Sequence, residues 1–352
     1  MRLLGVLIAL VAASLAADTA VGSYRVGVSE QAAAMFDNPA WQSLGLTRVR
    51  YLVPWDWYRH GQEAEVTGFM NAARARGQDV LVTFTAHRGC FDGRVYAPDP
   101  ACRAPSARAY REAIRTFDDR FPWVRTYSAW NEVNHISQPT FTSPNLAVRY
   151  YRVLLHQSRT RRFRVMAADL LDTANLFPYL RAFMRRAPGR PRLWGLHNYQ
   201  DVNLHTSADT RQMLATAPGE LWLTETGGIV RFGDSAQFGY SESRAAQSTR
   251  WLFTLADRYD APRRGRRSTL TRVYVYKWFG EPSDARFDAG LTDMYGTPRA
   301  GFFVFRRFAR ARTAPRHPGA SAPAISNPRP TSTSLGPSLP VEDTRRAERS
   351  AP

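Results

Sequence analysis

Residues 79–86 read DVLVTFTA, a run whose middle is continuously apolar and rich in β-branched and aromatic side chains. A strand with one face in water alternates polar and apolar residues, whereas a parallel strand covered by helices is apolar on both faces. The run therefore predicts a strand of a buried parallel sheet. Seven further runs of the chain have the same character, at 23–29, 47–54, 124–131, 163–169, 193–200, 220–226 and 272–279.

Helical patterns lie between these runs, and several begin at a residue suited to capping. Ser106, Ser143 and Ser241 each precede an amphipathic segment, and Pro144 occupies a first helical position. Alternating strands and helices predict either a closed (β/α)8 barrel or an open doubly wound sheet. No glycine-rich phosphate-binding turn follows the first run, and eight units within roughly 290 residues suit a single α/β TIM barrel.

The two ends of the chain differ from this central region. Residues 1–16 combine Arg2, a short apolar run and a small-x-small triplet, which predicts a signal peptide and a secreted product; an uncleaved anchor is the alternative. Residues 313–352 are rich in Pro, Ser, Thr and Ala, which predicts a disordered tail, possible in a cell-wall-associated protein. The catalytic domain is expected at 22–312.

The cysteines and the charge bear on compartment and partners. Cys90 and Cys102 bracket one loop, and in an exported protein we expect them to form a disulfide. The net charge is +18, but Lys277 is the only lysine and the arginines are scattered. This pattern indicates compositional bias, so we predict no nucleic-acid partner, no stable membrane association and a monomer.

Polar residues collect at the ends of the predicted strands, where the chemistry of a (β/α)8 barrel lies. Burying so many polar groups is costly unless they bond to one another or line a wet cleft. Taken singly, each has an ordinary structural explanation, but together they predict one site. The residues are Arg50, His87, Asn131, Glu132, His197, Tyr199, Glu225, Lys277 and Trp278.

The most informative pair is Glu132 and Glu225, at the ends of the predicted fourth and seventh strands. Two carboxylates about 5–5.5 Å apart can hydrolyse a glycoside with retention, one as a proton donor and the other as a nucleophile. Their proximity favours this division of roles, because one negative charge raises the pKa of its neighbour.

The order of motifs carries a family resemblance. VRYLVPWDWY, FTAH, WNE, HNY, TETGG and YKWF fall on the predicted strands 2, 3, 4, 6, 7 and 8. This order resembles the clan A retaining glycoside hydrolases, most closely the family 5 (cellulase-like) enzymes, over residues 22–300. The resemblance implies hydrolysis of O-glycosyl bonds in a β-linked oligo- or polysaccharide, with no cofactor and no metal.

The resemblance also implies individual roles. Glu132 would be the acid/base and Glu225 the nucleophile. Asn131 would hold the sugar 2-hydroxyl, while Arg50 and Tyr199 would keep Glu225 ionised and oriented.

The remaining matches are expected to bind sugar. His87 and His197 would line the subsite of the cleaved sugar, and Trp278 would form a stacking floor. Trp55, Trp57 and Phe279 are candidates to extend this aromatic platform.

Two departures from the family 5 pattern leave a family 39-like assignment open. Val133 follows the first glutamate where relatives often have Pro, and Thr226 follows the second where they often have an aromatic residue or Phe-Gly.

Three other classes of protein fit the sequence less well. A glycan-binding or transglycosylating barrel without significant hydrolysis is the main alternative, and the presence of both carboxylates argues against it. A metal-dependent hydrolase lacks an H-E-x-x-H or H-x-H motif with a third ligand, and a serine hydrolase lacks a G-x-S-x-G turn. Gluco-, manno-, xylo- and galacto-configured substrates, and endo or exo action, all fit this set of motifs.

Overall fold

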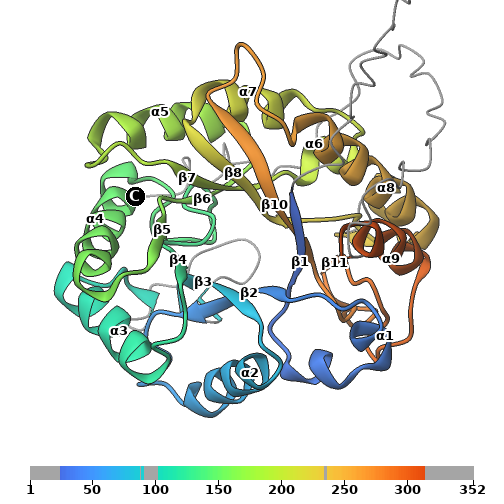
Figure 1. Ribbon diagram of the computed structural model, residues 1–352, viewed down its shortest axis with the longest axis horizontal. Helices are drawn as coiled ribbons and strands as arrows, with labels where there is room; N and C mark the ends of the chain where they lie inside the picture. The colour runs from blue at the N-terminus through green and yellow to red at the C-terminus, as the bar shows by residue number, and fades with distance from the viewer. Residues whose placement is uncertain (1–23, 88, 91–101, 234–235, 314–352) are drawn as a thin grey trace, which may run out of the picture.

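The computed structural model describes residues 24–87, 89–90, 102–233 and 236–313. The predicted signal peptide (1–16) and residues 314–352 of the predicted tail lie outside the described residues. Seen end-on in Figure 1, the strands lie at the centre and the helices surround them.

Nine parallel strands form one sheet in the order β5-β4-β3-β2-β1-β10-β8-β7-β6. All eight strand runs expected from the sequence contribute to it. The strands are β1 (Arg25–Ser29), β2 (Arg48–Pro54), β3 (Asp79–Thr85), β4 (Thr126–Ser128), β5 (Arg164–Met166), β6 (Asp169–Leu171), β7 (Leu193–His197), β8 (Gly219–Thr226) and β10 (Ser268–Tyr276). A separate antiparallel pair is formed by β9 (Arg231–Phe232) and β11 (Phe287–Asp288).

The two ends of this strand order, β5 and β6, are consecutive in the chain. The run predicted as the fifth strand, 163–169, covers β5 and the first residue of β6, with a break at Ala167 and Ala168. β5 pairs with β4, and β6 pairs with β7. The interruption keeps its backbone bonds to β7, because Ala167 N donates to Leu193 O (2.9 Å) and Gly195 N donates to Ala168 O (2.9 Å). The sheet therefore closes as an eight-stranded α/β TIM barrel, and the predicted fold is confirmed.

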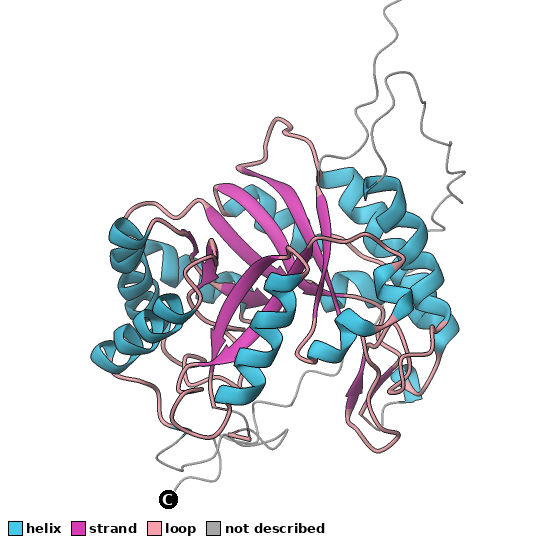
Figure 2. Ribbon diagram, turned by 60° about the horizontal axis from the view of Figure 1, so that its bottom comes forward, coloured by secondary structure: helices cyan, strands magenta, loops and turns pink. Residues whose placement is uncertain are grey.

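The helices cover the outside of the barrel, as Figure 2 shows from another direction. They are α1 (Pro39–Gln42), α2 (Glu63–Ala75), α3 (Ala107–Arg120), α4 (Pro144–Arg161), α5 (Leu176–Arg186), α6 (Tyr199–Asn203), α7 (Ala208–Thr216), α8 (Glu242–Tyr259) and α9 (Ala300–Thr313), with short 3-10 turns at Ala33–Asp37 and Ala236–Phe238. None of the described helices is long and apolar enough to cross a membrane.

The predicted helix starts are confirmed by their side-chain caps. Ser106, Ser143 and Ser241 accept hydrogen bonds from the backbone N–H three residues ahead, at 3.2, 3.3 and 3.2 Å. Each bond satisfies one of the donors that a helix N-terminus leaves unpaired.

The barrel interior is packed rather than hollow. One cluster of buried side chains takes one residue from each of five strands and is separate from the large core between strands and helices: Leu81, Met166, Leu193, Trp222 and Tyr274. Arg50 pairs in register with Leu81, so both side chains point inward. One layer of the barrel interior is therefore apolar. The neighbouring layer, toward the ends of the strands, is polar and contains the candidate site.

The predicted disulfide is present. Cys90 and Cys102 are bonded, with their Cα atoms 5.2 Å apart, and close a loop that follows β3.

Candidate active site

Arg50 lies at the centre of the polar residues inside the barrel. Its side chain is completely buried. Nη1 donates to Glu225 Oε2 (2.8 Å), and Nη2 donates to Asn131 Oδ1 (2.6 Å) and Asp169 Oδ2 (3.3 Å). Burial alone would lower the pKa of Arg50, but the charges of Asp169 and Glu225 outweigh it and raise that pKa. Arg50 is thus a buried positive charge that holds the neighbouring polar side chains in place by hydrogen bonds.

Glu225 is the penultimate residue of β8 and is held at both carboxylate oxygens. Oε2 accepts from Arg50, and Oε1 accepts from the Tyr199 hydroxyl (3.2 Å) at the start of α6. The pKa of Tyr199 is raised well above its usual value, by burial first and by the charge of Glu225 second. Tyr199 therefore keeps its proton and donates a hydrogen bond to Glu225.

Glu132 lies four residues beyond the end of β4, in a backbone conformation with φ +39°. Its Oε1 lies 3.0 Å from His197 Nδ1, and its Oε2 lies 3.7 Å from His135 Nδ1. His197 Nδ1 is also 3.8 Å from Glu225 Oε2. One imidazole at the end of β7 therefore lies between the two carboxylates.

The separation of the two carboxylates is short. One oxygen of Glu132, one oxygen of Glu225 and one nitrogen of His197 all lie within 4.8 Å of one another. Inverting glycosidases leave room for a water between carboxyl groups about 6.5–9.5 Å apart, whereas retaining enzymes hold them at about 5–5.5 Å. The distance between the Glu132 and Glu225 carboxylates agrees with the shorter of these two separations.

Glu132 is held in its ionised form in the free protein. Burial raises the pKa of Glu132, but the hydrogen bond to His197 and the positive charges of His135, His197 and Arg50 outweigh it and lower this pKa to about 2. Because Glu132 Oε1 and His197 Nδ1 are 3.0 Å apart, one proton can pass directly between them. Glu132 and His197 therefore form a hydrogen-bonded pair.

By distance, Glu132, His197 and Glu225 are also a candidate set of metal ligands. Arg50 already places a permanent positive charge 2.8 Å from Glu225 Oε2. A divalent cation bound there would be repelled by the Arg50 guanidinium, so we assign no metal to the site.

Among the described residues, no hydrogen bond joins His87 to the Arg50 network. Its Nδ1 is 3.2 Å from Asp56 Oδ1, and the other oxygen of Asp56 is 3.1 Å from His60 Nε2. The His87 side chain is 20% exposed, at the end of β3. Asp56 and His60, in the turn after β2, were not singled out from the sequence.

The stacking floor predicted for Trp278 does not agree with the structure. Trp278 is fully buried and packs edge-on against Trp41 and Phe302, with ring centroids 5.6 and 5.7 Å away. Trp57 is buried as well, against Phe117. Neither ring has an exposed face on which a sugar could lie.

Tyr276 is the aromatic residue that the sequence analysis missed. It ends β10 two residues beyond Tyr274, so the two side chains point to the same, inward face of the barrel. Burial raises the pKa of Tyr276 well above its usual value, and the next largest cause is the charge of Glu225. Tyr276 is partly exposed, which places a partly accessible ring near the carboxylates.

Asp169 was also missed, since it lay inside a run read as strand. It is fully buried beside Arg50. The signal in the sequence was a carboxylate within the apolar segment FRVMAADLL, which is unfavourable unless a partner lies nearby.

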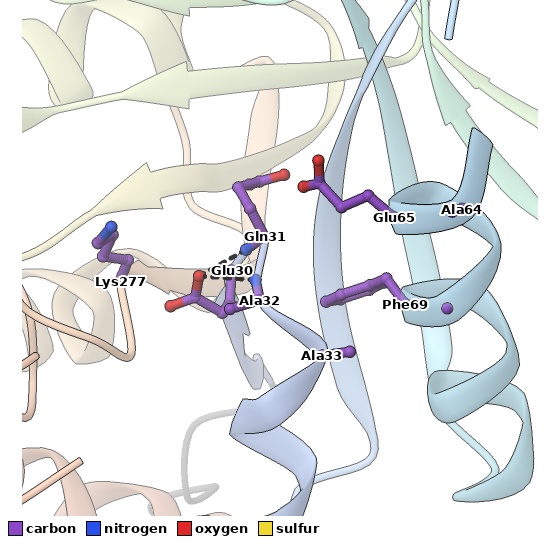
Figure 3. A pocket seen from close by; sticks show the side chains of 9 residues that line it. Glu30, Gln31, Ala32, Ala33, Ala64, Glu65, Phe69 and Lys277 are labelled. Carbon is purple, nitrogen blue, oxygen red and sulfur yellow. Dashed lines mark hydrogen bonds between the residues drawn. The ribbon is translucent and has the colours of Figure 1, made fainter. Parts of the chain in front are cut away.

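A pocket of about 450 Å³ lies beside the strand ends of β1 and β10, with Lys277 and Glu65 on opposite sides of Gln31 in Figure 3. Glu30 on its wall has a structural role. Its two oxygens accept from four backbone N–H groups, at Gln31 (2.6 Å), Ala32 (3.0 Å), Trp278 (3.0 Å) and Phe279 (3.1 Å). These bonds fasten the segment after β10 to the end of β1, next to Tyr276.

No protein-family model matches the chain, and no curated protein matches it in sequence. Solved structures do match, and the likeness is one of fold: the chain has a (β/α)8 fold similar to that of clan A glycoside hydrolases of families 5 and 39. The fold expected from the resemblance is thereby confirmed.

Three structures represent these neighbours. A family 5 (GH5_18) protein from Streptomyces cattleya in complex with Manβ1-4GlcNAc has a TM-score of 0.59 at 16% identity, covering 84% of this chain and 82% of that one. An exo-β-1,4-mannosidase from Opitutaceae bacterium strain TAV5 has a TM-score of 0.53 at 18% identity, covering 82% and 60%. An endo-1,4-β-xylanase from Caldicellulosiruptor owensensis has a TM-score of 0.54 at 13% identity, covering 81% and 97%.

Proposed function

We propose that this protein is a secreted retaining glycoside hydrolase that cleaves O-glycosidic bonds in a β-linked glycan by double displacement. The observation that carries the proposal is the close approach of Glu132 and Glu225 within 4.8 Å, with different partners on each. Glu225 is bonded to the Arg50 guanidinium and the Tyr199 hydroxyl, whereas Glu132 is bonded to the imidazole of His197.

In the first step, a Glu225 oxygen attacks the anomeric carbon and forms a glycosyl ester as the bond to the leaving oxygen breaks. The proton that neutralises the leaving oxygen comes from Glu132, and His197 supplies it to Glu132 across the 3.0 Å contact. The electron pair of the broken bond goes to the leaving oxygen, which departs as a neutral hydroxyl.

In the second step, Glu132 is a carboxylate and accepts a proton from water. That water attacks the anomeric carbon from the face the leaving group vacated, and Glu225 departs as an ionised carboxylate. Arg50 and Tyr199 stabilise the negative charge that returns to Glu225. Two inversions at one carbon give net retention.

Two further residues would contact the sugar. Asn131 Oδ1 accepts from Arg50, which leaves its amide N–H groups available to bond the sugar 2-hydroxyl. The ring of Tyr276, rather than that of Trp278, would pack against the apolar face of the sugar.

The compartment and the first substrates to try follow from separate observations. The predicted signal peptide and the disulfide between Cys90 and Cys102 support export to an oxidising compartment. A fold shared with a protein bound to Manβ1-4GlcNAc and with an exo-β-1,4-mannosidase supports placing β-mannosides early in a substrate screen, followed by β-xylosides and β-glucosides.

The test is a screen of aryl β-glycosides and β-linked polysaccharides, with the anomer of the first product followed by proton NMR. We expect the β-anomer to form first. Glu225→Gln should abolish turnover while keeping substrate binding, and Glu220→Gln on the same strand is the matched control that should keep it. First formation of the α-anomer, or parental activity in Glu225→Gln, would contradict the mechanism. Glycan binding without turnover by the parent would favour the non-hydrolytic alternative.

A further inference from the structure

Asp169 is a buried carboxylate to which the double-displacement steps assign no part. It is the first residue of β6, and its side chain is completely buried. Oδ1 accepts from Thr224 Oγ1 (2.6 Å), while Oδ2 accepts from Thr83 Oγ1 (3.2 Å) and lies 3.3 Å from Arg50 Nη2. Three other strands, β2, β3 and β8, therefore fix the position of this one charge.

The backbone of Asp169 also holds the segment that carries the proposed acid/base. Its N–H donates to Trp130 O (3.3 Å), and its carbonyl accepts from Val133 N (3.0 Å). These two bonds bracket Glu132, whose φ of +39° lies in the left-handed region that non-glycine residues rarely adopt. Asp169 thus contacts the acid/base segment through its backbone and Arg50 through its side chain.

Gly195 on β7 makes room for the carboxylate. A Cβ atom at this position would meet Asp169 Oδ1 at 1.7 Å and Thr224 Oγ1 at 2.8 Å. Glycine weakens a strand interior, and close approach of another group is a common reason for its presence there. The missing side chain of Gly195 therefore leaves the space that the Asp169 carboxylate occupies.

We propose that Asp169 is a positioning residue for glycoside hydrolysis: it shares the charge of Arg50 with Glu225 and fixes the guanidinium that orients Glu225 and Asn131. The inference rests on the proposed function. Without Asp169, Arg50 would be attracted to Glu225 alone, and the nucleophile would be both shifted and more tightly paired.

This role predicts an electrostatic signature. Asp169 faces Arg50 directly, and the other ionisable groups reached through Arg50 come from the ends of β4, β7, β8 and β10 and from α6: Glu132, His135, His197, Tyr199, Glu225 and Tyr276. A like charge disfavours ionisation of a carboxylate, so replacing Asp169 with a neutral residue removes a repulsion from the acids of the site. Both limbs of the pH–rate profile should then move to lower pH.

The experiment compares Asp169→Asn with the parent on the aryl glycoside that the parent hydrolyses fastest. We expect kcat to fall about 10- to 100-fold with KM little changed, since the chemical step loses its alignment. Both pH limbs should move down by roughly half a unit to one unit. A folded Asp169→Asn variant with the parental kcat, or with unmoved limbs, would overturn the proposal.

Asp118→Asn is the matched control, because Asp118 is also buried and accepts from Arg161 (2.6 Å) and the Tyr127 hydroxyl (3.2 Å), but on α3 outside the site. It should lose stability while its pH limbs stay in place; limbs that move as in Asp169→Asn would count against the proposal.

A second variant covers the case in which Asp169→Asn does not fold. Thr224→Val removes the hydroxyl that donates to Oδ1 and leaves the charge, so kcat should fall about 5-fold with unmoved pH limbs. A parental kcat in Thr224→Val would again overturn the role of Asp169. A parent inactive on every glycoside would instead refute the proposed function, and that result is known before any variant is made.

Discussion

Replacing Arg50 with Met tests whether one buried cation organises the site. The change keeps an apolar stem of similar length but removes donors to Glu225 (2.8 Å), Asn131 (2.6 Å) and Asp169 (3.3 Å). Breaking a buried pair by removing one partner costs about 3–5 kcal/mol, because the remaining charges are left without compensation. We therefore expect Arg50→Met to lose about 3–5 kcal/mol of unfolding free energy near pH 7.

The loss should depend on pH in a defined direction. Without Arg50, the buried carboxylates of Glu225 and Asp169 lose the opposite charge that they share, so their charged forms are less favourable in the folded state. An acid whose folded pKa is raised destabilises the fold above its unfolded pKa, and this penalty falls as the pH drops through the raised value. The difference between parent and Arg50→Met should therefore shrink between about pH 7 and about pH 5.

The assay is urea unfolding followed by tryptophan fluorescence at both pH values, with kcat measured on the folded proteins. We expect kcat to fall at least about 100-fold, since Glu225 loses its main electrostatic partner. Arg299→Met is the matched control: Arg299 donates to Asp288 (2.9 Å) in a buried pair outside the site, and its loss should reduce stability but not kcat. Parental stability of Arg50→Met near pH 7, or an equal loss at the lower pH, would refute the reasoning.

Four further outcomes are expected. Replacing Cys90 and Cys102 with Ser should cost about 3 kcal/mol by the loop-entropy relation for their separation of 12 residues, and a chemical unfolding midpoint equal to the parent's would contradict this. Ser143→Ala should cost about 1 kcal/mol through loss of the cap on α4, measured in the same way, with Ser143→Asp as the variant that keeps it. Tyr276→Ala should raise KM about 10-fold or more, and Tyr276→Phe should restore it if the ring packs on the sugar. Because the pKa of Glu132 is lowered to about 2, its contribution to stability is complete above its unfolded pKa and is lost as the pH falls toward 2. The difference in unfolding free energy between the parent and Glu132→Gln should therefore narrow between about pH 6 and about pH 3. A difference that stays constant over this range would show that the carboxylate is not stabilised in this way.

Much of the barrel could be predicted because its signals are local. Continuously apolar β-prone runs identified all eight strands, and Ser106, Ser143 and Ser241 identified helix starts that their side chains do cap. The predicted positions of the strand ends were less accurate. The runs expected at 193–200 and 272–279 end at His197 and Tyr276, because an apolar or aromatic residue beyond a strand resembles one within it.

The site shows where local signals stop. Arg50, Asn131, Glu132, His197, Tyr199 and Glu225 were predicted from their positions at strand ends, and the structure brings all six into one hydrogen-bonded group. His87 is bonded to Asp56, and its predicted place in the sugar subsite stays a prediction. The bend that separates β5 from β6 has no signal in FRVMAADLL, since apolarity continues through it, so the inward aim of Asp169 could not be read there.

The sequence by itself determined the class of fold, the disulfide and the two carboxylates on strands four and seven, since apolar period, capping residues and motif order are properties of neighbouring residues. The tertiary structure decided which groups meet. It buried Trp278 against Trp41 and placed Tyr276 beside Glu225, and it put Asp169 in the space that Gly195 leaves open. The physical reason is that the face on which a side chain emerges depends on where each strand bends and ends, and closure of the barrel sets those points.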